Sequence, residues 1–504
     1  MNSFKYGTIS TGSKEASFSA EQILKKGGNA FDAAVGAVFV SMTSEFALTG
    51  PFGGGTCVGM KNNTSPFVYD FFVDCPESTN DKKEFEEVAV NFGSTIQKFH
   101  IGKGSIAVPG NIAGLIKIHN DHGDLPLKEV LSYSILYAKN GIKITSYQSY
   151  IMGLIKPILT FSNNDLFIKN NSLISKGDTF KNPYFSDFLN ILIDEGVDYF
   201  YKENGLNDIL EYLGANSCLQ KSDFSNYKVH KRRPISIDLN GYTIYTNPAP
   251  SYGGTLIIFL LNLLKDNKNF NISALIKGMN LVSKAREEIC INPNDENEIS
   301  QILSKKNIKK YNQIFSSDDK IDTASDTDGF GSTTHVSIMD KKGNAVSITT
   351  TNGEGCGSII PKYGIMMNNM LGEVDLNPFG FHKWQIRRRL PTMISPIIVT
   401  KNSKPIYILG SGGSNRIRSA NIQVLINLLI KNMSLNKAID EPRIHLEGNT
   451  LFYEPGIILP EKYNSKYIHL NRFDDKNLFF GGVNAVSSNE AIADKRRGGT
   501  GIFC

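Results

Sequence analysis

The sequence GSTTHVSIMDKKGNAVSITTTNG, residues 331–353, indicates the central feature of the fold. Two runs rich in Val, Ile and Thr alternate in polarity on either side of Lys341–Gly343, a pattern typical of a β-hairpin with a three-residue loop. Glycine at the third loop position adopts the left-handed conformation without steric cost. This loop length predicts a register in which Thr333 lies opposite Thr351.

The two faces of the predicted hairpin differ in chemistry. We expect one face to point into the core, and it carries Thr334, Val336, Ile338, Val346, Ile348 and Thr350. The other face carries Thr333, His335, Ser337, Ser347, Thr349 and Thr351. β-propensity alone explains a row of hydroxyl groups on a strand, often on a wet face. A second explanation is that Thr333 is a nucleophile, which requires a base close to its hydroxyl group.

A threonine at the start of a chain carries its own base, because its α-amino group has a pKa of about 7.7–8.0. For Thr333 this requires cleavage of the peptide bond after Ser332. The preceding segment, residues 292–332, is rich in Asn, Asp, Ser and Lys and has few large apolar residues. We therefore expect a mobile processing linker there, although an ordinary linker has the same composition.

Several motifs accompany Thr333-Thr334-His335 in a regular order along the chain. They are Gly27–Val35, Gly53–Gly55, Ser105–Gly110, Asn247–Gly254, Asn368–Met370, Ser395-Pro396, Gly410–Ser414 and Glu441–Arg443. Together they resemble the γ-glutamyltranspeptidase (glutathione hydrolase) family of N-terminal-nucleophile hydrolases over nearly the whole chain. The resemblance implies a four-layer αββα sandwich, where composition alone indicates only an α+β fold. It also implies a self-cutting precursor whose large-subunit segment, 1–332, and small-subunit segment, 333–504, form one compact domain.

The resemblance implies roles for the site residues. Thr333 would attack the carbonyl carbon of Ser332 and cut the precursor, then attack a substrate amide, and water or an amino acid or peptide amine would release the acyl group. Thr351 would hydrogen-bond the Thr333 hydroxyl or amine. The N–H groups of Gly412 and Gly413 would stabilise the oxyanion, although a plain strand-to-helix turn also explains this pair. His335 is expected to be structural, since the family uses the α-amino group as base.

The substrate side of the resemblance is incomplete. Glu373, with Asp375 close by, would hold the amino group of a substrate, and Thr392 keeps one hydroxyl of the family's serine pair. The family's carboxylate-binding arginine, however, is replaced by Phe72. A phenyl ring cannot pair with a buried carboxylate, so we expect glutamyl recognition to be remodelled. Candidates for a replacement cation are Arg387, Arg389 and Arg416.

Three functions therefore remain open. The first is a γ-glutamyl hydrolase or transferase acting on glutathione and related compounds. The second is an amidase of the same mechanism with a different acyl group, in the manner of cephalosporin acylases. The third is an uncleaved binding protein without activity.

Composition excludes several other classes. The chain has 504 residues, a formal net charge of +5 and 40% hydrophobic residues, so nothing favours a nucleic-acid partner. Its six cysteines are scattered, without zinc spacing, and we expect no metal or cofactor. Without a signal peptide or a long apolar stretch, we expect a cytoplasmic protein with no membrane partner, unless the start site is misassigned, since many relatives are exported.

The sequence gives clear signals for four helices. Ser19 with Gln22, and Asn29 with Asp32, predict the starts of two successive helices, the second apolar on nearly every side and therefore buried. Leu256–Leu264 is expected to be a buried helix, and Gly410–Gly413 to lead into another that ends near Lys431.

Overall fold

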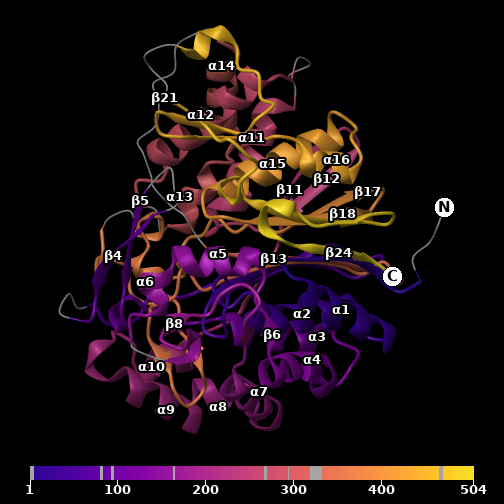
Figure 1. Cartoon of the computed structure of the whole chain (residues 1–504). Coiled ribbons are helices and arrows are strands. Elements are labelled where there is room, and N and C mark those ends of the chain that lie inside the picture. The colour runs from indigo at the N-terminus through magenta and orange to yellow at the C-terminus, as the bar shows by residue number, and fades with distance from the viewer. Residues whose placement is uncertain are drawn as a thin grey trace.

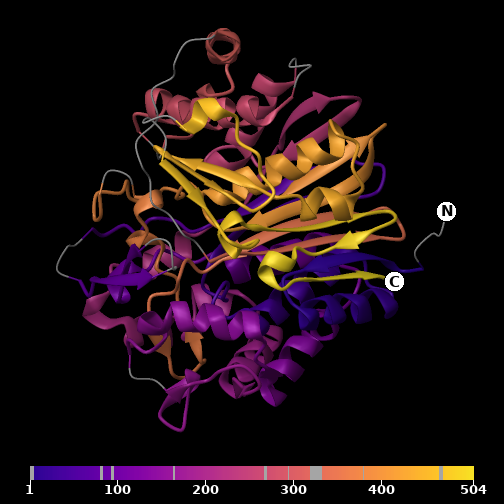
Figure 2. The same ribbon diagram turned by 45° about the horizontal axis from the view of Figure 1, so that its top comes forward.

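Two antiparallel β-sheets pack face to face, and helices cover both outer faces, as Figures 1 and 2 show. This computed structural model describes residues 5–79, 83–91, 96–162, 165–265, 270–292, 295–317, 332–377, 380–464 and 469–504. The four-layer αββα sandwich of the α+β class is therefore confirmed.

The first sheet contains the predicted hairpin at its centre. In spatial order its strands are β10 (His230–Arg232), β3 (Phe67–Phe71), β2 (Gly54–Met60), β14 (Ala345–Thr351), β13 (Thr334–Asp340), β1 (Gly7–Thr11) and β24 (Thr500–Phe503). Thr334 pairs with Thr350 and Met339 with Ala345, which is the predicted register. Strands from 1–332 and 333–504 alternate in this sheet, so the two segments share one core; the division between them stays a prediction.

The second sheet brings the glycine-rich motif of the C-terminal half to the hairpin. Its strands are, in order, β11 (Ile235–Leu239), β12 (Tyr242–Thr246), β17 (Ile397–Lys401), β18 (Lys404–Gly412), β22 (Gly482–Ser487) and β23 (Ala491–Ile492). The hydroxyl face of the hairpin packs against this sheet: the Ser347 hydroxyl donates to the carbonyl oxygen of Leu409 at 3.0 Å, and that of Ser337 donates to Asn484 at 3.1 Å. The row of hydroxyls is thus buried between two sheets rather than wet.

Helices form the two outer layers. The first sheet is covered by α1 (Lys14–Lys25), α2 (Ala30–Ser44) and α3 (Asn111–His122), with α4 (Leu127–Asn140) and α7 (Pro183–Glu195) outside them. The apolar face of the hairpin packs on α2, which is buried along its whole length. The second sheet is covered by α11 (Tyr252–Leu264), α15 (Arg416–Leu429) and α16 (Leu435–Asp440), with α12 (Ile272–Ile289) beside α11.

Of the two helix starts predicted in the N-terminal region, one is confirmed and the other is wrong. Asn29 and Asp32 form a capping box at the start of α2, as predicted. The prediction at Ser19 is wrong, because α1 begins six residues earlier, where the Ser13 side chain accepts from the N–H of Ala16. The close approach expected of the glycine loop is present: a Cβ on Gly53 would overlap the carbonyl oxygen of Thr351.

Two stretches of the segment 292–332 are helical in the described part of the chain. It contains α13 (Glu296–Gln301) and α14 (Lys305–Ser316), and these bury Ile299, Ile302 and Tyr311 against α11 and α12. Tyr311 packs edge-on to Phe259, with ring centroids 5.4 Å apart. A few apolar residues at helical spacing were therefore enough to dock this part, whereas residues 318–331 lie outside the described part of the chain.

Shorter elements complete the described structure. The helices are α5 (Ser146–Leu154), α6 (Lys156–Leu159), α8 (Asp198–Tyr201), α9 (Asn204–Leu213) and α10 (Lys221–Asn226). The strands are β4 (Glu86–Asn91), β5 (Ile96–Ile101), β6 (Ile142–Lys143), β7 (Ile168–Lys169), β8 (Ser172–Leu173), β9 (Thr179–Phe180), β15 (Ile359–Ile360), β16 (Ile365–Met366), β19 (Ile444–Glu447), β20 (Thr450–Tyr453) and β21 (His469–Arg472). None of the helices described combines the length and apolarity needed to cross a membrane.

Candidate active site

A cavity of about 30 Å³ lies where the N-terminal end of β13 meets the C-terminal end of β18. It has room for about two water molecules in the uncut chain. Its lining comprises Phe72, Thr333, Thr351, Met370, Glu373, Asp375, Leu376, Thr392, Met393, Ile394, Ser414 and Ile417. The structure therefore brings together five of the predicted site residues, the first and last of which, Thr333 and Thr392, are 59 positions apart in the sequence.

Thr333 is buried at the start of the hairpin, next to Ser332, which is buried too. The Thr351 hydroxyl donates to the main-chain carbonyl oxygen of Ser332 and accepts from the N–H of Gly353 at 3.0 Å. A hydroxyl has one hydrogen, so in the uncut chain Thr351 donates to the carbonyl group of the peptide bond predicted to break. Such a donor polarises the carbonyl group that Thr333 would attack. The predicted hydrogen bond of Thr351 to the hydroxyl or amine of Thr333 stays a prediction.

Gly412 lies directly against Thr333, and Gly413 follows it in the chain. A Cβ on Gly412 would be 2.9 Å from the carbonyl carbon of Thr333 and would overlap its oxygen. Gly413 has φ +124°, a conformation that L side chains rarely adopt. Glycine at position 412 therefore lets the end of β18 approach Thr333 this closely, just ahead of α15, whereas a Cβ on Gly413 would meet Arg497 and Gly481. Their role as oxyanion donors stays a prediction.

The substrate side of the cavity is acidic and poorly solvated. Burial, followed by the nearby Asp375 and Glu354 carboxyls, raises the pKa of Glu373 well above its usual range. Burial also raises the pKa of Asp375, although the Ser414 hydroxyl donates to its carboxylate at 2.5 Å. Oxygen Oε1 of Glu373 has no hydrogen-bond partner in the described part of the chain. The cavity thus offers an unused acceptor beside two carboxyls.

The candidate replacement cations all lie elsewhere. Arg389 donates to Asp70 at 3.0 Å and to Asp74 at 2.6 Å. Arg387 is exposed and donates to Glu77 at 2.7 Å, and Arg416 lies 3.6 Å from Glu447. Among the described residues that line the cavity, none is an arginine or lysine, and Phe72 occupies the wall.

His335 lies between the sheets, where it holds hydroxyl groups in place. Its Nδ1 is 2.7 Å from the Thr349 hydroxyl and its Nε2 is 2.8 Å from the Ser337 hydroxyl. Burial lowers the pKa of this imidazole to about 3, so it is neutral at ordinary pH. These contacts fit the structural role expected for it.

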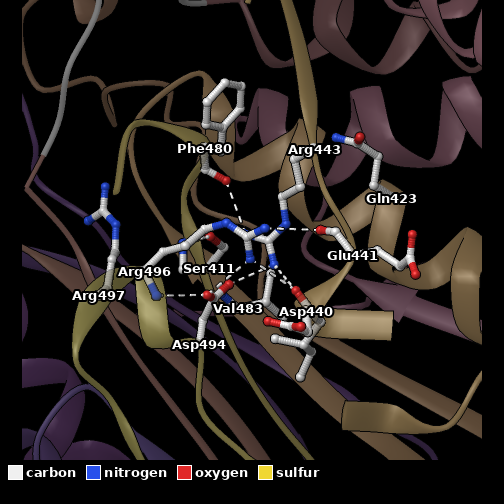
Figure 3. Close-up of polar contacts among 12 residues, drawn as sticks. Ser411, Gln423, Asp440, Glu441, Arg443, Phe480, Val483, Asp494, Arg496 and Arg497 are labelled. Atoms are coloured by element: carbon white, nitrogen blue, oxygen red, sulfur yellow. Dashed lines mark hydrogen bonds and ion pairs between the residues drawn. The ribbon is translucent and has the colours of Figure 1, made fainter. Parts of the chain in front are cut away.

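A buried ion-pair network contacts β22, the strand that pairs with the glycine-containing end of β18 (Figure 3). Arg443 donates to Asp494 at 2.6 Å, and Arg496 donates to Glu454 at 2.5 Å and to Asp494 at 3.2 Å. Asp494 also accepts from the N–H of Val483 at 3.0 Å, in the strand that pairs with Ser411 and Gly412. The motif Glu441–Arg443 therefore contributes to positioning β22 and, through it, the glycine pair.

Sequence reasoning missed Glu354 and the apolar part of the lining. The Ser332 hydroxyl donates to the Glu354 carboxylate at 2.6 Å. A carboxylate between two glycines, Gly353 and Gly355, three residues after Thr351, was the available signal. Met370 and Leu376 lie in 3-10 helices of three residues and Met393 lies in a loop, and such short segments have no spacing from which to predict them. No group of His, Cys, Asp or Glu suited to a metal ion occurs in the described ranges.

Comparison with known proteins decides the family. The family model described as gamma-glutamyltranspeptidase matches residues 16–504. The chain belongs to the gamma-glutamyltranspeptidase family. Among curated members, the glutathione hydrolase proenzyme of Bacillus subtilis (strain 168) is 27% identical over 555 aligned residues, covering 99% of this chain and 91% of that protein.

Other relatives carry acylase names. The acylase ACY 1 proenzyme of Pseudomonas sp. (strain V22) is 27% identical, covering 96% of this chain and 90% of that protein. The crystal structure of cephalosporin acylase from Bacillus halodurans superposes with a TM-score of 0.83 at 20% identity, covering 99% of this chain and 96% of that one. This gamma-glutamyltranspeptidase family member thus shares the fold of an acylase as well as its family's sequence pattern.

Proposed function

We propose that this protein is a self-processing hydrolase that cleaves amide bonds through an acyl-enzyme on Thr333. The observation that carries the proposal is the placement of Thr333: it begins the central hairpin, lines the cavity, packs on Gly412 and follows a carbonyl group that the Thr351 hydroxyl polarises. After cleavage the Thr333 amine would accept the proton of its own hydroxyl, and water or an amine would then release the acyl group.

The acyl group we propose carries an amino group but no carboxylate that needs a cationic partner. A substrate ammonium group beside Glu373 would offset the cost of ionising that carboxyl and would use its unpartnered Oε1. A glutamyl α-carboxylate would instead meet Phe72 and the buried carboxyls of Glu373 and Asp375, where an unpaired negative charge is costly. γ-Glutamyl compounds are the second candidate, which the glutathione hydrolase names of relatives favour.

Cleavage is tested first, by intact mass and amino-terminal sequencing of the purified protein. We expect two fragments, with the smaller one starting at Thr333. Thr333→Ala should give one uncut, inactive chain. A wild-type protein that stays whole and inactive would favour the binding-protein alternative, and a Thr333→Ala protein that still splits after Ser332 would exclude Thr333 as the nucleophile.

The acyl group is tested with four matched p-nitroanilides: γ-glutamyl, 4-aminobutanoyl, glutaryl and butanoyl. The first carries an amine and a carboxylate, the second the amine alone, the third the carboxylate alone and the fourth neither. We expect the highest kcat/KM for 4-aminobutanoyl, after subtracting spontaneous cyclisation in a blank without enzyme. A preference for γ-glutamyl over 4-aminobutanoyl would mean that the carboxylate is recognised, and the γ-glutamyl candidate would replace ours.

A further inference from the structure

Two hydroxyl–carboxyl contacts bracket Thr333 in the uncut chain. On the side that would leave, the Ser332 hydroxyl donates to Glu354 at 2.6 Å. On the side that would stay, the Thr334 hydroxyl donates to Glu45 at 2.9 Å. Both carboxyls are buried, and burial raises the pKa of each to about 7. Removing a carboxyl group from water costs free energy. Two buried carboxyls beside the predicted cleavage site therefore point to a function.

A hydrogen bond and two glycines fix the conformation of the turn that carries Glu354. The main-chain N–H of Glu354 donates to Asn369 Oδ1 at 2.8 Å, which ties the turn to the Asn368–Met370 motif. Glycines with positive φ on either side, at 61° for Gly353 and 85° for Gly355, turn the chain so that the carboxylate faces Ser332. The same turn carries Thr351, whose hydroxyl holds the Ser332 carbonyl oxygen. Ser332 is therefore held both at its carbonyl group and at its side chain.

We propose that Glu354 is a positioning residue of self-cleavage, which orients the Ser332 carbonyl carbon toward Thr333 through the Ser332 hydroxyl. This proposal rests on the proposed function, because it concerns the step that matures the enzyme. The proposal therefore requires a residue with a hydroxyl group at position 332 of the precursor, because Glu354 acts through that hydroxyl group.

The chemistry of self-cleavage explains why the contact between Ser332 and Glu354 would act in that step alone. The Thr333 Oγ forms a bond to the Ser332 carbonyl carbon, the C–N bond breaks, and the hydroxyl proton ends on the Thr333 nitrogen. One water molecule then hydrolyses the ester, which restores the Thr333 hydroxyl and leaves Ser332 with a new carboxylate and a released proton. That carboxylate would belong to the residue whose hydroxyl contacts Glu354, and a second negative charge there would disfavour ionisation of Glu354, so the contact favours the precursor over the product.

The test is a double-mutant cycle on the cleavage rate of the full chain made by cell-free synthesis, followed by the appearance of the fragment that starts at Thr333. Ser332→Ala should slow cleavage on the order of 10- to 100-fold, the effect of losing a hydrogen bond to a charged group. Glu354→Gln, which keeps one amide oxygen as an acceptor but loses the charge, should slow cleavage by less than Ser332→Ala. The double variant should be no slower than the slower single variant. Ser332→Thr, which keeps the hydroxyl, should stay within a few-fold of wild type.

The contact between the Thr334 hydroxyl and Glu45 supplies the matched control. Glu45→Gln combined with Ser332→Ala should show independent effects that multiply, since Glu45 contacts Thr334 and not Ser332. Multiplying effects for Ser332→Ala with Glu354→Gln, or wild-type cleavage by Ser332→Ala, would overturn the proposal while the wild-type chain still splits. A wild-type chain that does not split would overturn the proposed function as well. If Glu354→Gln fails to fold, the comparison of Ala and Thr at position 332 still decides.

Discussion

Replacing Asp494 by Asn should destabilise the protein strongly, because both carboxylate oxygens are fully used. Oδ2 accepts from Arg443 at 2.6 Å and from the N–H of Val483 at 3.0 Å. Oδ1 accepts from the N–H of Arg496 at 3.0 Å and from its guanidinium at 3.2 Å. An asparagine has one oxygen and one NH₂ group, so in either orientation the NH₂ group would face two donors.

The magnitude follows from burial and charge. Burial raises the pKa of Asp494. The guanidinium groups of Arg443 and Arg496, together with the main-chain N–H donors, lower it by more than that, so the pKa is below its usual value and the group is ionised. The side chains of this network are almost fully buried, at 2% exposure for Arg443, Asp494 and Arg496. Breaking a buried ion pair while leaving its partner charged costs about 3–5 kcal/mol. This is about a fifth or more of the roughly 5–15 kcal/mol by which folded proteins are stable.

The assay is urea unfolding of the chain in the Thr333→Ala background, in which we expect one uncut polypeptide. Asp494→Asn should shift the midpoint without changing the slope, since the surface exposed on unfolding is the same. The matched control is Asp198→Asn, because Asp198 and Lys202 form an ion pair of 3.0 Å with both side chains more than half exposed. We expect a loss below about 1 kcal/mol there. Equal losses for the two variants would refute the reasoning.

Three further outcomes are expected. Thr351→Ala should slow both cleavage and turnover on the order of 10- to 100-fold while leaving some cleavage, because one donor to the reacting carbonyl is lost; wild-type rates in a fragment time course and a turnover assay would contradict its assigned role. Gly412→Ala should lower kcat/KM at least about 100-fold with an unchanged circular dichroism spectrum, because the new Cβ would displace the Thr333 main chain; full activity would show that this close approach is dispensable. Folding stability should fall as pH falls below about 6.5, by roughly 1.4 kcal/mol per pH unit for His335, because the unfolded imidazole binds a proton near pH 6.5 and the buried one only near pH 3. Urea midpoints at pH 7 and pH 5.5 measure this, and a His335→Gln protein with the same pH dependence as wild type would exclude His335 as its source.

Local patterns in the sequence were enough for the features that depend on neighbours a few residues apart. The hairpin register follows from alternation over seven residues on each side of a loop ending in Gly343, and a one-residue slip would expose its apolar face. The start of α2 follows from Asn29 and Asp32, whose side chains satisfy N–H groups of the same turn. The order of motifs along the chain was sufficient to predict the family, which the family model confirms; the nucleophile stays a prediction.

Only the tertiary structure decided which distant groups share a cavity. Phe72, Thr333, Glu373 and Thr392 line one cavity because four segments meet at the ends of two sheets. Arg389 is bound by Asp70 and Asp74 and so cannot serve a substrate, which no spacing in the sequence indicates. Electrostatic partners and burial depend on separations of many tens or hundreds of residues, and these are set by the packing of the whole sandwich rather than by local conformation.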